Sequence, residues 1–262
     1  MIDIHCHILP AVDDGPSSLD EAVMMARLAA ASGVRRIVAT PHQLAWDPTA
    51  IRNILVGVQR LQRELHLAGI GLSLTTGCEL RLGPELLLES GNERLHTLNR
   101  SRYLLVELPA AEFPPYTEAL IFELQVRGLV PIVAHPERNA ATQDDPDRYA
   151  RLVERGVMGQ LTASSLSAAA ERRTRQTAER LLRRGLVHVL ASDAHDADQR
   201  APDLAQGLAA VARIVGRQQA EAMVYRIPEA IWSDRDLVGH LPQPVGQTER
   251  SKQWRWLPIK LF

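Results

Sequence analysis

The chain has 262 residues, 45% of them hydrophobic and 23% charged, a composition typical of a folded protein and too apolar for a disordered one. Its 30 basic residues balance 31 acidic ones, and this net charge of −1 argues against a protein built to bind nucleic acid. No apolar run approaches the roughly 18 residues of a membrane span, and the first residues lack the basic and apolar regions of a secretory signal. Two cysteines are too few for a disulfide scaffold, so we expect a cytoplasmic protein without membrane insertion.

Short runs rich in Val, Ile and Leu alternate along the chain with amphipathic stretches. Ser18 and Glu21 form a predicted capping box at the start of the first such stretch. The alternation predicts an α/β fold with a parallel sheet, either curled into a barrel or open and doubly wound. The predicted strands span residues 2–6, 35–39, 72–77, 103–107, 130–134, 157–161 and 187–191. The predicted helices span residues 18–32, 48–67, 115–127, 146–155, 167–184 and 203–215.

The last 20 residues depart from this alternation. No linker rich in Pro, Gly or Ser divides the preceding chain, so we expect one domain over residues 1–242. Residues 243–262 read as a tail that packs on the domain surface or is partly disordered. The tail is polar at first and then carries Trp254, Trp256, Leu257, Ile259, Leu261 and Phe262.

Histidines and carboxylates gather where the predicted strands end. Because the carboxyl ends of parallel strands meet at one rim, residues far apart in sequence would share one site there. Four other histidines are not grouped with candidate ligands at a strand end, and we interpret these as structural or surface residues: His66, His96, His188 and His240. The residues at the strand ends are His5, His7, Asp13, Asp14, His42, Glu79, Glu107, His135, Asp193 and His195.

The spacing of these residues favours metal binding. Alternate side chains of a strand face the same way, so His5 and His7 would face the site together while Cys6 faces the other side. Imidazoles with carboxylates suit Mn, Fe or Zn. So many ligands predict two or three ions, with Glu79 bridging a pair. Multi-metal sites of this kind hydrolyse phosphate esters.

Some assignments near the rim stay open. One of the two adjacent aspartates is expected to be a metal ligand. Either Asp13 stabilises the turn at residues 15–16 and Asp14 is the ligand, or Asp13 is the ligand. Asp3 is expected to orient a ligand rather than to bind metal. Arg138 and Arg200 follow His135 and His195 closely, and their guanidinium groups suit phosphate oxygens; the alternative for each is a surface salt bridge.

Nucleophilic thiol chemistry is excluded by position. A thiolate phosphatase loop ends in an arginine six residues after its cysteine, but Val12 and Pro84 occupy those positions after Cys6 and Cys78. We therefore expect both cysteines to be small buried residues. The sequence also lacks the GxxxxGK[ST], GxGxxG and GxSxG motifs.

The order of motifs IHCH, VDDG, TPH, Glu79, Glu107, AHPER and SDAH resembles the PHP (polymerase and histidinol phosphatase) superfamily. The wording MIDIHCHILPAVDDGP, LVELP, PIVAHPER and HVLASDAH looks like its CpsB/YwqE branch, the manganese-dependent protein tyrosine phosphatases of bacterial capsule and exopolysaccharide operons. The resemblance runs from Met1 to about Trp232. It implies a distorted (β/α)7 TIM-like barrel with a site for three Mn²⁺ ions.

By matching position, the resemblance also implies the role of each site residue. Arg138 would grip phosphate, with Arg200 beside it. The stretch QLAWDP after His42 departs from the pattern, since it has no nearby Arg or Lys. The first ion would be held by His5, His7, Glu79 and Asp193, the second by Glu79, Glu107 and His135, and the third by Asp14, His42 and His195.

The implied activity is hydrolysis of phosphotyrosine by a metal-bound hydroxide, with a tyrosine autokinase as the partner protein. Two alternatives remain at this stage. One is a small-molecule phosphatase such as a histidinol phosphatase, and the other is a non-catalytic metal-binding regulator of polysaccharide assembly. The sequence leaves the oligomeric state open.

Overall fold

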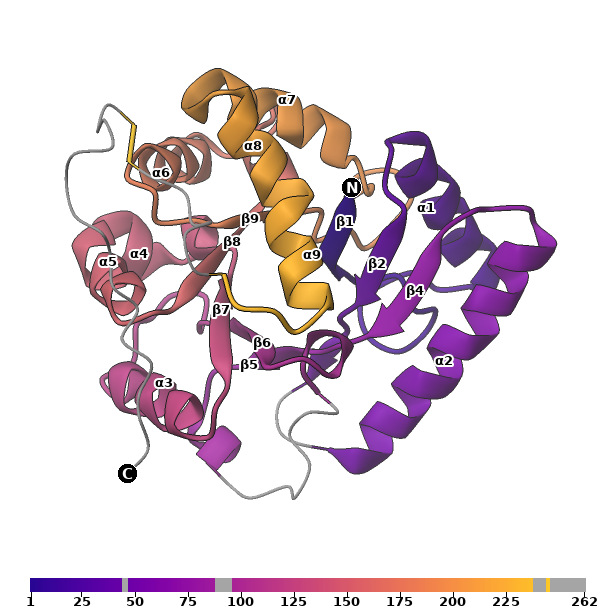
Figure 1. Cartoon of the computed structure of the whole chain (residues 1–262), viewed down its shortest axis with the longest axis horizontal. Helices are drawn as coiled ribbons and strands as arrows, with labels where there is room; N and C mark the ends of the chain where they lie inside the picture. The colour runs from indigo at the N-terminus through magenta and orange to yellow at the C-terminus, as the bar shows by residue number, and fades with distance from the viewer. Residues whose placement is uncertain (44–46, 88–95, 238–243, 246–262) are drawn as a thin grey trace.

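The computed structural model describes residues 1–43, 47–87, 96–237 and 244–245 (Figure 1). The predicted tail, residues 243–262, lies outside the described residues except for positions 244 and 245. Within the described ranges, no helix is both long enough and apolar enough to cross a membrane.

All strand pairs in the described part of the chain are parallel, as predicted. One sheet has the order β1-β2-β4, and the other has the order β3-β5-β6-β7-β8-β9. A parallel bridge between Cys6 and Ala194 connects the first sheet to the end of the second. The strands are β1 (Ile2–Cys6), β2 (Arg36–Ala39), β3 (His42–Gln43), β4 (Ser73–Thr76), β5 (Glu79–Arg81), β6 (Tyr103–Glu107), β7 (Val130–Ala134), β8 (Met158–Thr162) and β9 (Val189–Ala191).

Each predicted strand is present, with its ends displaced by no more than two residues. The short strands β3 and β5 were not predicted. They continue the directions of β2 and β4 after breaks at Thr40–Pro41 and Gly77–Cys78. Pro41 has no N–H to donate to a neighbouring strand, which favours a break there. The two breaks transfer hydrogen bonding from one sheet to the other and carry His42 and Glu79 side by side in the paired strands.

The helices pack around these strands. Helices α1 and α2 lie beside β1, β2 and β4, whereas α3 to α6 lie on the opposite side of the molecule (Figure 1). The helices are α1 (Leu19–Ala31), α2 (Pro48–Leu67), α3 (Thr117–Val126), α4 (Ala140–Asp144), α5 (Pro146–Glu154), α6 (Arg172–Arg183), α7 (Leu204–Val215), α8 (Arg217–Val224) and α9 (Arg226–Trp232). Short 3-10 turns include η1 (Pro84–Leu87), η3 (Leu98–Arg100), η4 (Pro136–Arg138) and η5 (Ala163–Leu166).

Two local predictions need correction. Ser18 caps α1 by accepting from the Glu21 N–H, as predicted, but the Glu21 carboxylate accepts from the Ser17 N–H rather than from Ser18. The predicted helix over residues 167–184 starts only at Arg172. The serine-rich stretch before it forms η5, where the Ser165 hydroxyl donates to the buried Glu137 carboxylate at 2.7 Å. Residues 167–170 form a turn in which the Ala170 N–H donates to the Ser167 carbonyl at 3.2 Å, so the helix begins later than predicted.

The apolar core has two parts. The larger cluster lies between the strands and the surrounding helices. The smaller cluster collects residues along the strands, such as Ile4, Leu105 and Ile132, together with Ile227 and Ile231 of α9. Figure 1 shows α8 and α9 running diagonally across the strands at the centre of the view. Helix α9 therefore packs in the same apolar cluster as these strand residues, while polar side chains gather at and just beyond the carboxyl ends of the strands.

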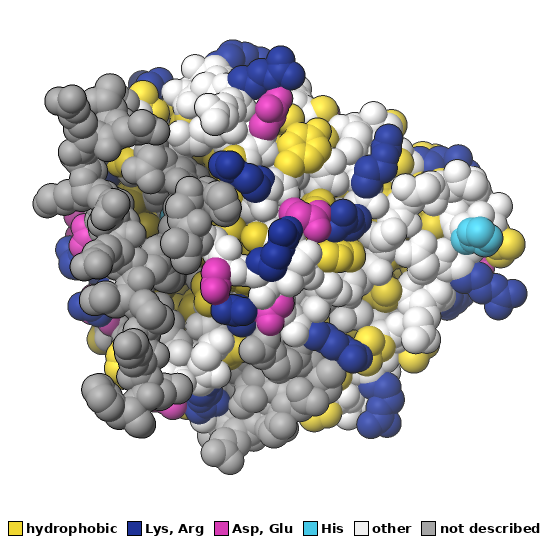
Figure 2. All heavy atoms as spheres, viewed as in Figure 1, with side chains coloured by type: hydrophobic (Ala, Val, Ile, Leu, Met, Phe, Trp, Pro, Cys, Tyr) yellow, Lys and Arg dark blue, Asp and Glu magenta, His cyan; other side chains and the backbone are white. Residues whose placement is uncertain are grey.

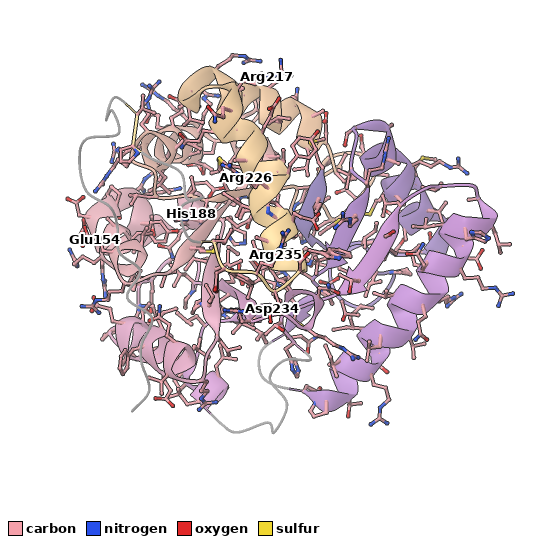
Figure 3. The ribbon with its side chains drawn as sticks, viewed as in Figure 1. Glu154, His188, Arg217, Arg226, Asp234 and Arg235 are labelled. Carbon is pink, nitrogen blue, oxygen red and sulfur yellow. The ribbon has the colours of Figure 1, made fainter. Side chains whose placement is uncertain are left out.

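The face seen in Figure 2 carries interspersed basic and acidic side chains rather than a field of one sign. Asp234 and Arg235 follow directly after α9 (Figure 3). Arg102 forms ion pairs with Asp234 at 2.9 Å and Asp236 at 2.7 Å, which tie β6 to the segment after α9. The charged side chains of these ion pairs therefore stabilise the fold by joining two segments that are distant in sequence.

Candidate metal centre

A β-bulge in β1 directs the first two histidines toward the rim. Three steps along β1, from Asp3 to Cys6, pair with only two steps along β2. Before the bulge Ile4 belongs to the inner apolar cluster, and after it Cys6 belongs to the outer one. His5 and His7 consequently face the site together, as the alternation predicted. A bulge is a common device for re-aiming a side chain beside a functional site.

Two other site residues have unusual backbone conformations. His135, directly after β7, has φ 31°, and Asp193, two residues after β9, has φ 53°. Left-handed backbone at a residue with a Cβ costs about 1 kcal/mol or more. The Asp193 N–H donates to the His5 carbonyl at 2.8 Å, which ties the end of β9 to β1 and helps to hold this conformation.

Glu79 lies at the centre of the site and is almost fully buried. Its Oε2 lies 3.2 Å from His5 Nε2, 3.3 Å from His7 Nε2 and 3.1 Å from His42 Nδ1. Its Oε1 lies 2.9 Å from His135 Nε2. One carboxylate therefore faces imidazoles of strands β1 and β3 and of the residues directly after β1 and β7, which suits a bridging ligand.

All nine predicted ligands fall into groups whose ligand atoms lie within 4.8 Å of one another. Solvent exposure differs across the site: the side chains of His5 and His7 are fully buried, whereas that of Asp14 is 58% exposed. One edge of the cluster therefore opens to solvent. The four groups are His5, His7 and Asp193; His5, Glu79 and His135; His42, Glu79 and Glu107; and His7, Asp14, His42 and His195.

The donor atoms themselves fit a cation. Glu79 Oε2 and His195 Nε2 are buried without a hydrogen-bond partner among the described residues. The Nε2 atoms of His5 and His7 lie only 3.1 Å apart. At that distance a proton or a cation must lie between or beside the two nitrogen atoms, because two bare lone pairs would repel. Buried, unpaired oxygen and nitrogen atoms facing one another are the arrangement that divalent cations require.

The electrostatics point the same way. Burial disfavours a charged His7, but Asp13 and Glu79 outweigh it and raise the pKa of His7 to about 10. Burial likewise opposes protonation of His135, and Glu79 raises its pKa to about 9. Burial opposes ionisation of Glu79 too, yet His5, His135 and His7 hold the pKa of Glu79 well below its usual range. The carboxylates thus stabilise positive charge among the imidazoles, as they would stabilise bound cations.

Asp13 and Asp14 occupy different positions. Asp13 accepts from the backbone N–H of Gly15 and of His42, and its Oδ2 lies 2.6 Å from His7 Nδ1. Asp14 is directed instead toward the Nε2 atoms of His42 and His195, at 3.6 and 3.3 Å. This geometry gives Asp13 the turn and the orientation of His7, and it places Asp14 with the ligands.

The two predicted arginines converge on one oxygen. Arg138 Nη1 donates to Asp193 Oδ2 at 2.6 Å, and Arg200 Nη2 donates to the same atom at 3.1 Å. The other oxygen, Asp193 Oδ1, faces His5 Nε2 at 3.3 Å. Both guanidinium groups are about one-third exposed, so each also has a side open to an anion.

A cavity of about 270 Å³ opens beside this pair. Arg138, Arg200 and His135 contribute polar groups to its wall, while Leu108 and Ala110 contribute apolar ones. The cavity therefore joins cationic groups to a short apolar surface, a combination that fits an anionic group attached to an apolar body.

Sequence analysis did not single out Asn139, which holds the loops around this cavity. Its amide nitrogen donates to the carbonyls of Pro109 and Glu112 at 2.7 and 3.0 Å. Its amide oxygen accepts from the Thr142 N–H at 2.8 Å and so caps α4. Arg138 also donates to the Ser164 hydroxyl at 3.3 Å. Asparagine is favoured at helix N-caps, so its place directly after AHPER is a sequence signal that could have indicated this role.

The histidines expected to be structural lie apart from these groups. His66 is exposed on α2. His96 is buried and accepts from the Asp47 N–H, and His188 is buried and accepts from the Gly159 N–H. His240 lies outside the described residues. Cys6 and Cys78 are both buried and unpaired, as predicted.

Fold and site together define an α/β protein of parallel strands with a metal centre at their carboxyl ends. Residues 1–233 match the family described as "Capsular polysaccharide synthesis, CpsB/CapC". The chain belongs to this family, which confirms the branch predicted from the motifs.

Individual relatives agree with this membership. The chain is 34% identical over 249 residues to the tyrosine-protein phosphatase YwqE of Bacillus subtilis, covering 94% of this chain and 96% of YwqE. It is 38% identical over 201 residues to the putative tyrosine-protein phosphatase CapC of Staphylococcus aureus, covering 76% of this chain and 79% of CapC. A crystal structure from work on B. subtilis YwqE and Streptococcus pneumoniae CpsB, described as unique metal-dependent tyrosine phosphatases, superposes with a TM-score of 0.84 at 33% identity. The superposition covers 94% of this chain and all of that one.

Proposed function

We propose that this chain is a metal-dependent protein tyrosine phosphatase of capsule or exopolysaccharide synthesis. The observation that carries the proposal is the convergence of nine ligand side chains on one rim beside two arginines that share Asp193. Membership of the CpsB/CapC family and the similarity to YwqE support it. The fold that we assign is the distorted (β/α)7 barrel implied by the resemblance, over residues 1–242.

The residues of the chain divide the work of hydrolysis. Arg138 and Arg200 bind the phosphoryl oxygens through their open sides and stabilise the negative charge that grows during the reaction. The imidazoles and carboxylates at the rim would hold divalent ions, which would supply a nucleophilic water and neutralise the phosphoryl oxygens. Leu108 and Ala110 offer an apolar surface to the aromatic ring of the substrate. The phenolate leaving group has a parent pKa of about 10, so it needs less protonation than an alkoxide would.

The ligand assignment that we propose is the one implied by the family resemblance. We assign Mn²⁺ as the ion, with two or three ions bound and Fe or Zn as substitutes. Glu79 bridges two sites because both of its oxygens face imidazoles. The three ligand sets that we propose are His5, His7, Glu79 and Asp193; Glu79, Glu107 and His135; and Asp14, His42 and His195. The structure groups Glu79 with His5 and His135, and also with His42 and Glu107.

The substrate that we propose is a phosphotyrosine on a bacterial tyrosine autokinase. The cavity opens at an exposed rim, so a flexible phosphorylated segment can reach it without a change in the fold. We place the chain in the cytoplasm, because two buried unpaired cysteines suit a reducing compartment.

One experiment separates this function from its alternatives. Metal content is measured by elemental analysis, and phosphate release is followed from a phosphotyrosine peptide and from histidinol phosphate, before and after chelation. We expect bound metal and preferential turnover of the peptide, lost after chelation and restored by Mn²⁺. Preferential turnover of histidinol phosphate would instead identify a small-molecule phosphatase. A metal-loaded protein that releases phosphate from neither compound nor from p-nitrophenyl phosphate would be a regulator.

A further inference from the structure

Strand β8 lies between two strands that lead to ligands, yet none of its own residues belongs to a ligand group in the described chain. Its inner face begins with Met158, a member of the inner apolar cluster. It continues with Gln160 and Thr162, and both are fully buried. A buried amide is unfavourable unless its polar atoms are hydrogen-bonded, so the contacts of Gln160 indicate what it does.

The Gln160 amide oxygen accepts two hydrogen bonds from ligand residues. One comes from the backbone N–H of His135 at 3.2 Å, and the other joins this oxygen to His5 Nδ1 at 2.9 Å. A backbone N–H can only donate, so the Gln160 atom at this position must be the oxygen. His5 Nδ1 must therefore carry its proton toward Gln160, which leaves the Nε2 lone pair of His5 directed at the ligand cluster.

The other end of the amide extends the same network. Gln160 Nε2 donates to the Thr162 hydroxyl at 3.4 Å, and that hydroxyl lies 3.5 Å from Asp193 Oδ2. One buried side chain thus connects residues at the ends of β1, β7 and β9. Gln160 does not line the cavity beside Arg138 and so acts only through its neighbours.

We propose that Gln160 is a positioning residue for the metal centre, which fixes the tautomer and ring orientation of His5 and the left-handed backbone of His135. This inference rests on the proposed metal-dependent function. Neighbours of this kind, which orient a metal-binding histidine through its second nitrogen, typically change metal affinity 10- to 100-fold when they are replaced.

Two variants separate positioning from general support of the fold. Gln160→Met keeps a similar volume but removes the acceptor, whereas Gln160→Glu keeps an acceptor at the same place. The matched control is Gln62→Met, because Gln62 also bridges two backbone groups, the Leu72 carbonyl at 3.0 Å and the Leu74 N–H at 2.8 Å, away from the ligand cluster. Mn²⁺ affinity is measured by competition with a chelating dye, and the melting temperature is measured on the metal-free proteins.

We expect Gln160→Met to weaken Mn²⁺ binding about 10- to 100-fold. Gln160→Glu is expected to bind at least as tightly as the parent, and Gln62→Met is expected to lower only the melting temperature. Parental affinity in Gln160→Met, or equal losses in Met and Glu, would overturn the proposal. If Gln160→Met does not fold, a loss of affinity in Gln160→Glu overturns it and retention supports it. If the parent protein binds no Mn²⁺, the proposed function is wrong as well. If the parent binds Mn²⁺ and Gln160→Met binds it equally tightly, only the role of Gln160 is wrong.

Discussion

Asp193 shows how one side chain can serve two parts of the site. Its Oδ1 faces the imidazoles, and its Oδ2 receives both arginines. Burial opposes its ionisation, but His5, His135 and the two arginines hold the pKa of Asp193 below its usual range. The Asp193 carboxylate therefore interacts with the candidate metal ligands through one oxygen and with both arginines through the other.

Arg138→Lys tests the arginine pair. A lysine keeps the charge but loses the planar group that can bond Asp193 and phosphate together. Losing one charged hydrogen bond of about 1.5–3 kcal/mol should lower kcat/KM for p-nitrophenyl phosphate about 10- to 100-fold. The control is Arg155→Lys, since Arg155 pairs with Glu118 on the surface. Unchanged kinetics in Arg138→Lys would contradict the assigned role.

His188→Asn tests a buried histidine outside the site (Figure 3). Burial lowers the pKa of His188 to about 4, while its Nδ1 accepts from the Gly159 N–H. The unfolded chain, with a histidine pKa of about 6.5, binds more protons between these values. Stability from this group is therefore complete above pH 6.5 and is lost as the pH falls toward 4. Linkage gives a loss of about 2 kcal/mol between pH 7 and pH 5.

An asparagine at position 188 keeps an acceptor without a titrating ring. The difference in unfolding free energy between pH 7 and pH 5 should then shrink by about 2 kcal/mol relative to the parent. Urea denaturation in the presence of EDTA measures this difference. Equal pH slopes in the two proteins would show that His188 is not held neutral in the fold.

At the scale of elements, the turn formed by η4 and α4 carries several functions in succession. His135 faces Glu79, Glu137 binds η5, and Arg138 reaches the cavity. Asn139 then joins this turn to the loop after β6. The positions of Arg138 and of the loop that follows Glu107 consequently depend on one buried amide.

Asn139→Asp should weaken both stability and catalysis. The carboxylate still accepts from Thr142, but it cannot donate to the carbonyls of Pro109 and Glu112. Unpaired buried groups cost about 1–3 kcal/mol each, which denaturation would measure, and kcat/KM should fall because the two loops are uncoupled. The matched control is Asn99→Asp, which loses its donation to the Trp232 carbonyl far from the ligands. Equal kinetics for the two variants would refute the coupling.

At the scale of the whole molecule, the strands have an apolar half and a polar half. Helix α9 packs on the inner apolar cluster, and the imidazoles and carboxylates gather at the carboxyl ends. The fold thus concentrates negative charge and unpaired donor atoms in one place, where bound cations would stabilise the folded state only.

Metal binding should therefore appear as stability. Saturation with Mn²⁺ at 100 times the dissociation constant should add about 2.7 kcal/mol to the free energy of unfolding. Melting curves in Mn²⁺ and in EDTA measure the difference. Glu79→Gln should remove most of it, because the bridging charge is lost. If the melting temperature of the parent protein is the same in Mn²⁺ and in EDTA, the fold does not contain a metal centre.

Much of the architecture could be predicted from local patterns. Short apolar runs predict the strands, most helices and the parallel pairing. Motifs of a few neighbouring residues each predict the family. The gathering of the candidate ligand residues follows too, because parallel strands bring their carboxyl ends to one rim whatever the details of packing.

Other features depended on contacts between distant residues. The bulge in β1 arises from pairing with β2, and the hydrogen bond between Ser165 and Glu137 joins two turns that are distant in sequence. The separate positions of Asp13 and Asp14 depend on where His7 and His42 lie. Local propensity determined which segments form strands and helices, but the long-range hydrogen bonds decided where each side chain points, since only folding brings those partners within reach.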